Sequence, residues 1–276
     1  GAGKGGQAHL GPMPKSANNR NRRGRANHPF NGRNVRLNAK ICQVSDRGDL
    51  QELLQLVEQH HWDMNCVNLS TLLHRIARLA KRNAVAWAIA AQPQLAAIRR
   101  RIESELAEQE SRLRQSPPEQ DLEMVGGSKG DRASLPRCWA TIAWSYATLQ
   151  IRDVSSFQRI AHLSQAHLPA FKTFELANLL WAFAKMQINE APFLEATMRM
   201  IPSHLDKFSP VSLSTVAWAY VTLQPHPPAA LLKRLSQVFI TNIKEAASQE
   251  IANMCWALAT AKVLKPPISA ELGNAA

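Results

Sequence analysis

Tryptophan recurs at a nearly constant interval through the second half of this chain. The spacing is 37 residues from Trp144 to Trp181 and from Trp181 to Trp218, and 38 residues from Trp218 to Trp256. The surrounding segments are similar and read WATIAWSYATLQI, LANLLWAFAKMQI, LSTVAWAYVTLQP and IANMCWALATAKV. A weaker earlier copy, LSTLLHRIARLAK, has His74 in place of tryptophan. A repeat of this length is typical of stacked helical hairpins and excludes an ordinary single-core domain.

Each tryptophan segment is followed by a short break and then by a second amphipathic segment. These second segments read SFQRIAHLSQAHL, FLEATMRMIPSHL and AALLKRLSQVFITNI. Pro192, Pro227 and Pro228 stand where a helix can begin, because proline is tolerated in a first turn. We therefore predict an all-α fold, a right-handed α-solenoid of helical hairpins with 37–38-residue repeats, in which residues 134–276 form the regular repeats.

Residues 37–133 are expected to form degenerate first helical repeats. Helices are predicted to begin after Asp46, a candidate N-cap, and at Asn68 or Ser70, and a long helix is predicted over QLAAIRRRIESELAEQESRLRQ. The stretch 115–132, which reads QSPPEQDLEMVGGSKGDR, combines proline, glycine and charge and is expected to be a flexible insertion. Such an insertion would account for the 70 residues between His74 and Trp144.

The net charge of +12 is concentrated at the start of the chain. Residues 1–36 lack apolar periodicity and are expected to form an extended basic tail. Residues 1–40 contain no Asp or Glu and nine basic residues, namely Lys4, Lys15, Arg20, Arg22, Arg23, Arg25, Arg33, Arg36 and Lys40. Subtracting those nine charges from +12 leaves +3 for the rest of the chain. Such a segment is suited to ordering on RNA. The alternative is a remnant of an organelle-targeting peptide, and the two can coexist.

Alignment of the five copies on the marker position, meaning the tryptophan or His74, separates core positions from a polar stripe. The positions one before, two before and two after the marker are apolar and are predicted to form the core, together with the tryptophans themselves. Three before the marker stand Thr71, Thr141, Asn178, Thr215 and Asn253, and four after it stand Arg78, Thr148, Lys185, Thr222 and Thr260. The position one after the marker is small or basic: Arg75, Ser145, Ala182, Ala219 and Ala257. These three columns fall on one helical stripe.

The stripe is the candidate RNA-binding surface. Helical-repeat proteins read single-stranded RNA with a few side chains per repeat, and Glu or Lys would be better helix formers than Thr or Asn on a merely exposed face. Passive exposure and hydrogen bonding between repeats are the alternatives. Arg75, Arg78, Lys81 and Arg82 add a basic patch that suits contacts with phosphate, which read no sequence.

No stretch of the sequence predicts catalysis. The segment GAGKGG at residues 1–6 lacks the spacing and the Ser or Thr of a P-loop. His60, His61 and His74 do not have metal-ligand spacing, and Cys138 has no nearby His or Asp that would activate a nucleophile. The apolar runs are far shorter than the roughly 18 residues that a membrane span needs. We therefore expect neither an enzyme nor a metal, cofactor or membrane protein.

The segments LANLLWAFAKM and IANMCWALATAKV resemble the LAN-x-LWALA signature of octotricopeptide and heptatricopeptide repeats, which are organellar helical-hairpin repeats related to RAP-domain proteins. The resemblance covers roughly residues 134–263, and CVNLSTLLHRIARLAKR looks like a degenerate first repeat of protist members of that family. It implies a location in the mitochondrion, or alternatively the plastid, and a role with organellar RNA. No RAP domain is visible, which puts a nuclease-like activity in doubt.

We expect a non-catalytic RNA-binding repeat protein, foremost a mitochondrial ribosome subunit that holds possibly fragmented rRNA beside neighbouring ribosomal proteins. The alternatives are an organellar factor for mRNA maturation or stability and a protein-binding scaffold of an organellar complex. The absence of an initial Met indicates that the ends are not natural termini, so further repeats or another domain could lie downstream.

Overall fold

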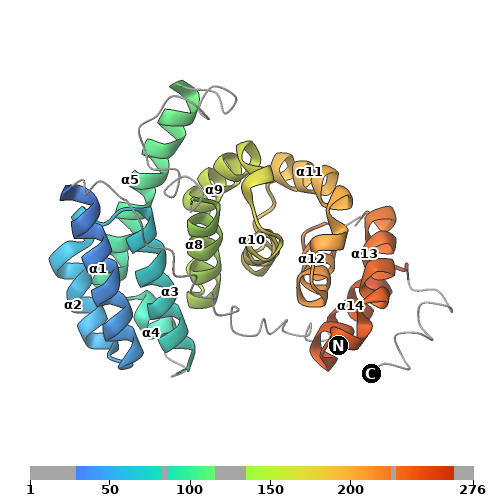
Figure 1. Ribbon diagram of the computed structural model, residues 1–276, viewed down its shortest axis with the longest axis horizontal. Coiled ribbons are helices and arrows are strands. Elements are labelled where there is room, and N and C mark those ends of the chain that lie inside the picture. Colours follow the sequence, from blue (N-terminus) through green and yellow to red (C-terminus); the bar gives the residue numbers. More distant parts are fainter. Residues whose placement is uncertain (1–28, 83–85, 116–134, 225–227, 264–276) are drawn as a thin grey trace, which may run out of the picture.

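The computed structural model describes residues 29–82, 86–115, 135–224 and 228–263, and within these ranges the chain is helical and contains no strand (Figure 1). The α-helices are α1 (Pro29–Asp46), α2 (Leu50–His60), α3 (Cys66–Arg82), α4 (Ala86–Ala90), α5 (Pro93–Gln115), α8 (Leu135–Leu149), α9 (Val154–Ala166), α10 (Thr173–Met186), α11 (Ala191–Met200), α12 (Pro210–Leu223), α13 (Ala229–Thr241) and α14 (Ser248–Thr260). Short 3-10 helices stand at His61–Asp63, Leu168–Ala170, Ile201–Ser203, Leu205–Lys207 and Ile243–Glu245. The prediction of an all-α chain is confirmed for these residues.

The helices form two rows. In the inner row, α1 packs against α3, α3 against α8, α8 against α10, α10 against α12, and α12 against α14. In the outer row, α2 contacts α5, α5 contacts α9 and α9 contacts α11, while α13 packs on α12. Figure 1 shows an arch in which α10 and α12 lie on the inside and α9 and α11 on the outside. Each hairpin thus touches mainly its neighbours in sequence.

Aromatic rings fill the space between the two rows. Phe157 of α9 packs edge-on against Phe183 of α10 with ring centroids 5.0 Å apart, and Phe183 lies 5.2 Å from Phe193 of α11. The positions two after the marker are fully buried in every copy: Ile76, Tyr146, Phe183, Tyr220 and Leu258. The columns one and two before the marker are buried as well, except that Cys255 is half-buried. The predicted core columns are therefore confirmed.

The marker residues form a ladder of rings along the inner row. Centroid separations are 5.2 Å for His74 and Trp144, 6.5 Å for Trp144 and Trp181, and 6.5 Å for Trp218 and Trp256. Trp144, Trp181 and Trp218 are at most 9 % exposed, so their predicted place in the core is confirmed. Trp256, on the last described helix, is half-buried.

A common C-terminal cap ends three of the inner helices. Gln150, Gln187 and Lys262 follow α8, α10 and α14 with φ angles of 60°, 53° and 57°. The next amide donates to the carbonyl five residues earlier, in the pairs Ile151 to Tyr146, Ile188 to Phe183 and Val263 to Leu258. This is the Schellman arrangement, which satisfies otherwise unpaired carbonyl groups. After α12, Gln224 instead has φ −116°, since Pro225 follows it and disfavours the helical region.

The first hairpin, α1 and α2, contains no tryptophan and begins earlier than predicted. α1 begins at Pro29, so the predicted boundary of the tail at residue 36 falls within a helix, and Arg33 and Arg36 lie on α1. The N-cap of α2 is Asp49 rather than Asp46, because the Asp49 carboxylate accepts the Glu52 N–H at 2.8 Å.

The next two predicted boundaries have different outcomes. α3 begins at Cys66, before Asn68 and Ser70, because the Asn65 side chain accepts the Asn68 N–H at 3.0 Å and caps the first turn. The long helix predicted after residue 93 is confirmed as α5, which is 23 residues long. The insertion predicted at 115–132 lies outside the described residues, apart from Gln115, which ends α5.

α5 takes the outer position of the second hairpin. Its buried Glu110 carboxylate is paired with Arg159 and with His162 of α9, the latter at 3.1 Å. Its Gln109 accepts a hydrogen bond at 2.8 Å from the Trp139 indole of α8. These contacts join the degenerate N-terminal part to the regular repeats.

Candidate nucleic-acid interface

Positive charge is concentrated on the inner row. Its basic residues are Arg33, Arg36 and Lys40 on α1, Arg75, Arg78, Lys81 and Arg82 on α3, Arg137 on α8 and Lys185 on α10. The acidic residues of the six inner helices are Asp46, Glu175 and Glu250. Glu175 and Glu250 are occupied at helix N-termini, where they accept the Lys172 and Ala247 amides at 3.0 and 2.7 Å. The inner row is therefore strongly cationic.

Many cations of the outer row have a carboxylate partner. The ion pairs are Arg99 with Asp153, Arg101 with Glu105, Arg112 with Glu108, Arg159 with Glu110, and Arg199 with Glu195. The two sides of the arch therefore differ in electrostatic character, although both contain arginine. A polyanion would be attracted to the inner side.

The strongest cluster of charge lies on α3, which contains no acidic residue. Arg75 pairs with Asp46 of α1 at 3.0 Å. Arg78, Lys81 and Arg82 are exposed, and within the described part of the chain none of them forms an ion pair. Cations in the last turn of a helix also complement its dipole, so part of this pattern stabilises α3 itself.

Arg137 extends this cluster across the seam between α3 and α8. Burial and the charges of Arg78, Arg75 and Arg137, in that order, lower the pKa of His74 to about 4. His74 is therefore neutral at pH 7, and guanidinium groups from two helices surround it. The sequence reasoning missed Arg137. The signal was present, since Arg137 lies seven residues, or about two helical turns, before Trp144 and so on the same helical face.

The predicted polar stripe is not one continuous surface. The small residues one after the marker, Ser145, Ala182, Ala219 and Ala257, are fully buried. They lie where successive inner helices pack together, and small side chains allow that close approach. The prediction that this column belongs to a polar working face is wrong for these four repeats. Arg75 alone reaches partly into solvent, because its side chain is long.

The column three before the marker is also less exposed than predicted. Thr215 is 1 % and Asn178 is 9 % exposed, so neither presents a free side chain on the surface, whereas Thr71, Thr141 and Asn253 are half-buried. The neighbouring inner helix covers this column most fully in the middle of the arch. A ladder with one contact from this column in every repeat is therefore contradicted at Asn178 and Thr215.

The column four after the marker does face solvent. Arg78, Lys185, Thr222 and Thr260 are exposed and Thr148 is half-buried. The Thr222 hydroxyl donates to the Trp218 carbonyl at 2.8 Å within its own helix. In the described residues neither this column nor the column three before the marker forms a hydrogen bond to a neighbouring repeat. The exposed charges at this end of the inner helices are Arg78 and Lys185.

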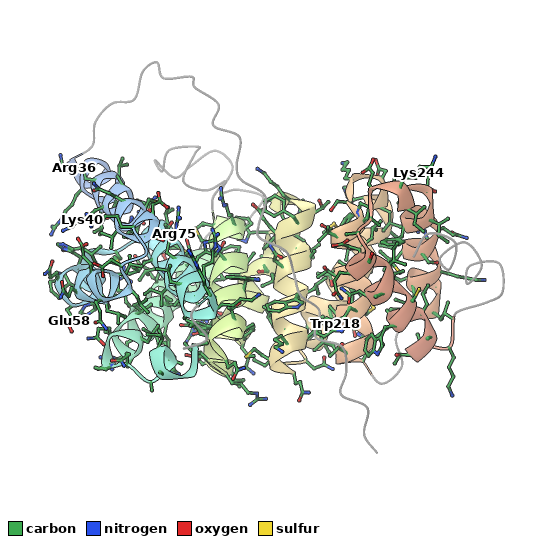
Figure 2. All side chains as sticks on the ribbon, turned by 90° about the horizontal axis from the view of Figure 1, so that it is seen from below. Arg36, Lys40, Glu58, Arg75, Trp218 and Lys244 are labelled. Carbon is green, nitrogen blue, oxygen red and sulfur yellow. The ribbon has the colours of Figure 1, made fainter. Side chains whose placement is uncertain are left out.

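The remaining predicted contacts divide between described and undescribed parts of the chain. Lys4, Lys15, Arg20, Arg22, Arg23 and Arg25 lie outside the described residues. Arg33, Arg36 and Lys40 lie on α1, and Figure 2 shows Arg36, Lys40 and Arg75 along α1 and α3 at the N-terminal end of the molecule. The structure thus brings the end of the basic segment next to the α3 cluster.

The comparisons with known proteins leave the family open. No protein-family model matches the sequence, and no curated protein matches it. In the described ranges, no group of three or more His, Cys, Asp or Glu side chains is placed to hold a metal ion. The helices described here include none that is both long and apolar enough to cross a membrane.

Proposed function

We propose that this chain is a non-catalytic RNA-binding α-solenoid, foremost a subunit of a mitochondrial ribosome that holds rRNA against its inner face. The observation that carries the proposal is the α3 cluster, which has no acidic residue, together with Arg137 across the seam. Arg and Lys bind phosphate, and unneutralised cations on one face are the electrostatic footprint of a nucleic-acid-binding protein.

The mode of binding is dominated by phosphate contacts. The tryptophan ladder is packed in the core, so it supplies no stacking platform, and the buried threonine and asparagine positions limit base readout. Contacts to phosphate fix the position of RNA without reading its sequence. This mode suits a protein that clamps an RNA whose sequence is specified by other partners, as a ribosomal component does.

Neutralising the seam tests the proposal. We expect Arg78→Gln with Arg137→Gln to weaken binding of a single-stranded 20-nucleotide RNA, measured by fluorescence anisotropy between 50 and 200 mM salt. Loss of two phosphate contacts lowers the slope of log K against log salt by about 1.4, since each contributes about 0.7 on a single strand. The control is Arg112→Gln with Arg199→Gln, two exposed arginines with intrahelical carboxylate partners. Equal affinity and slope in a folded Arg78/Arg137 variant would contradict the proposal.

A ribosomal role differs from a transient role in mRNA maturation by its stability in salt and its stoichiometry. We expect the tagged protein to co-purify with mitochondria rather than plastids and to co-sediment with the organellar ribosome through a high-salt cushion. Release from the ribosome at moderate salt, with retention of mRNA, would favour the maturation factor.

One observation favours a protein-binding scaffold as the second candidate. On α14, Ala252 and Ala259 are exposed and Trp256 is half-buried, whereas the equivalent residues of α12, Ser214 and Val221, are covered. Within the described residues no helix covers this face of α14. Association with a protein partner that is insensitive to salt and unaffected by Arg78→Gln with Arg137→Gln would support the scaffold and count against RNA binding.

A further inference from the structure

A basic pocket lies between α1 and the end of α2. It has a volume of about 200 Å³ and is lined by Arg33, Arg36, Leu37, Lys40 and His60, with no carboxylate in its lining. Arg36 and Lys40 stand one helical turn apart on the exposed side of α1, as Figure 2 shows. Like charges at this spacing repel each other, so their juxtaposition is unfavourable unless an anion lies between them.

The cations of the pocket are not equivalent. The Arg33 guanidinium already pairs with Asp63 at 2.6 Å, an interaction that neutralises its charge and holds α1 against the segment after α2. Arg36 and Lys40 form no ion pair within the described part of the chain, and both are exposed. The available positive charge of the pocket therefore comes from Arg36 and Lys40.

His60 and Leu37 give the pocket its shape. His60 is the last residue of α2 and faces the α1 cations from the opposite helix, so donors converge from two directions. Leu37 is 8 % exposed and forms an apolar wall between Arg33 and Lys40. A recess of this kind screens a bound charge less than the open surface does. Several N–H donors around one centre suit an anion with several acceptor oxygens.

We infer that this pocket binds a phosphate group, which Arg36 and Lys40 neutralise and to which His60 donates a hydrogen bond. The inference rests on the proposed RNA-binding function in one of its two forms, in which the phosphate belongs to the RNA backbone. In the other form the ligand is a free phosphate or phosphate monoester. The pocket then gives the N-terminal cations a defined binding site rather than a diffuse electrostatic role.

The test uses the full chain and a charge-neutralised variant, Arg36→Gln with Lys40→Gln. Both residues are exposed and glutamine is a good helix former, so α1 is expected to persist, as circular dichroism will show. The matched control is Arg47→Gln with Arg112→Gln, whose guanidinium groups are exposed and already paired with Glu52 and Glu108. A third variant, His60→Ala, removes the donor from α2 without changing the charge of α1.

For the RNA form, we expect the Arg36/Lys40 variant to bind single-stranded RNA roughly tenfold more weakly at 0.1 M salt, with a salt slope lower by about 1.4. His60→Ala should weaken binding by a smaller factor with little change in slope. For the free-phosphate form, titration of the wild type with inorganic phosphate and with adenosine monophosphate should shift the His60 ring resonances in a saturable way. That shift should be absent in the Arg36/Lys40 variant.

The outcomes separate this inference from the proposed function. If the Arg36/Lys40 variant binds RNA like the wild type and phosphate does not perturb His60, the pocket inference is overturned. Loss of RNA binding in Arg78→Gln with Arg137→Gln would still uphold the proposed function in that case. If saturable phosphate binding depends on Arg36 and Lys40 while neither double variant affects RNA affinity, the pocket stands and the RNA function fails.

Discussion

The imidazole of His74 packs against the indole of Trp144 with ring centroids 5.2 Å apart, in the place where Trp144 itself packs against Trp181 at 6.5 Å. His74 therefore continues the ring ladder in a repeat that lacks tryptophan. Its neutral form fits there because arginines surround it, whereas a charged imidazolium would be repelled.

Stability is expected to fall between pH 7 and pH 5 because of His74. The pKa of His74 is lowered from 6.5 to about 4 in the folded protein, so below pH 6.5 the unfolded chain binds a proton that the folded chain excludes. Linkage gives a loss of up to about 2 kcal/mol at pH 5 and none at pH 7. Urea unfolding at both pH values will measure it. His74→Phe should reduce this pH dependence, whereas His204→Gln should retain it.

Trp181→Ala is expected to destabilise the protein by about 3–5 kcal/mol, because it removes a 7 % exposed indole and leaves a cavity between inner helices. The measurement is the free energy of unfolding by urea. Trp62→Ala is the control, because Trp62 is 58 % exposed and its loss should cost less than about 0.5 kcal/mol. Similar effects from the two substitutions would contradict the ladder as a core element.

Gln187→Gly is expected to stabilise the fold by about 0.5–1 kcal/mol. Gln187 has a φ angle of 53°, a conformation that glycine adopts without strain at a helix C-terminus. At Gln224 the same substitution should be neutral or destabilising, because φ is −116° and glycine only adds freedom to the unfolded chain. Thermal melts of the two variants side by side will show whether the signs differ.

Glu110→Ala is expected to cost about 2 kcal/mol. The Glu110 side chain is 8 % exposed, and its removal leaves Arg159, itself 31 % exposed, without its partner on α5. Glu195→Ala is the comparison, since Glu195 is 59 % exposed and 3.8 Å from Arg199, and should change stability by less than about 0.5 kcal/mol. Equal unfolding free energies for the two variants would show that the α5–α9 contact does not support the junction.

The spacing of Trp144, Trp181 and Trp218 predicted the inner helices and their core columns correctly, because a helix that recurs in equivalent surroundings keeps the same buried positions. Boundaries were predicted less well where several candidates stood close together. Asp46 and Asp49 are both acceptable N-caps by residue type, and only the position of the Glu52 amide distinguishes them. The hairpin of α1 and α2 was missed because no tryptophan marks it.

The candidate surface was predicted in composition more than in geometry. The cations of α3 are exposed as the sequence indicated, and Arg137 joins them only because α8 packs beside α3. Thr215 and Thr222 are chemically alike and both lie on the predicted stripe, yet one is 1 % exposed and the other faces solvent. Helical periodicity places both on one side of α12 but does not say how far the next helix extends over that side.

The sequence by itself determined the repeat, the helical class and the cationic character of the N-terminal half, because these depend on spacing and composition along one chain. The tertiary structure alone decided which stripe residues are covered, that Arg36 and Lys40 of α1 share a pocket with His60 of α2, and that Arg137 meets the α3 cluster. Those relationships depend on how closely separate helices approach each other, a quantity that packing sets and periodicity does not contain.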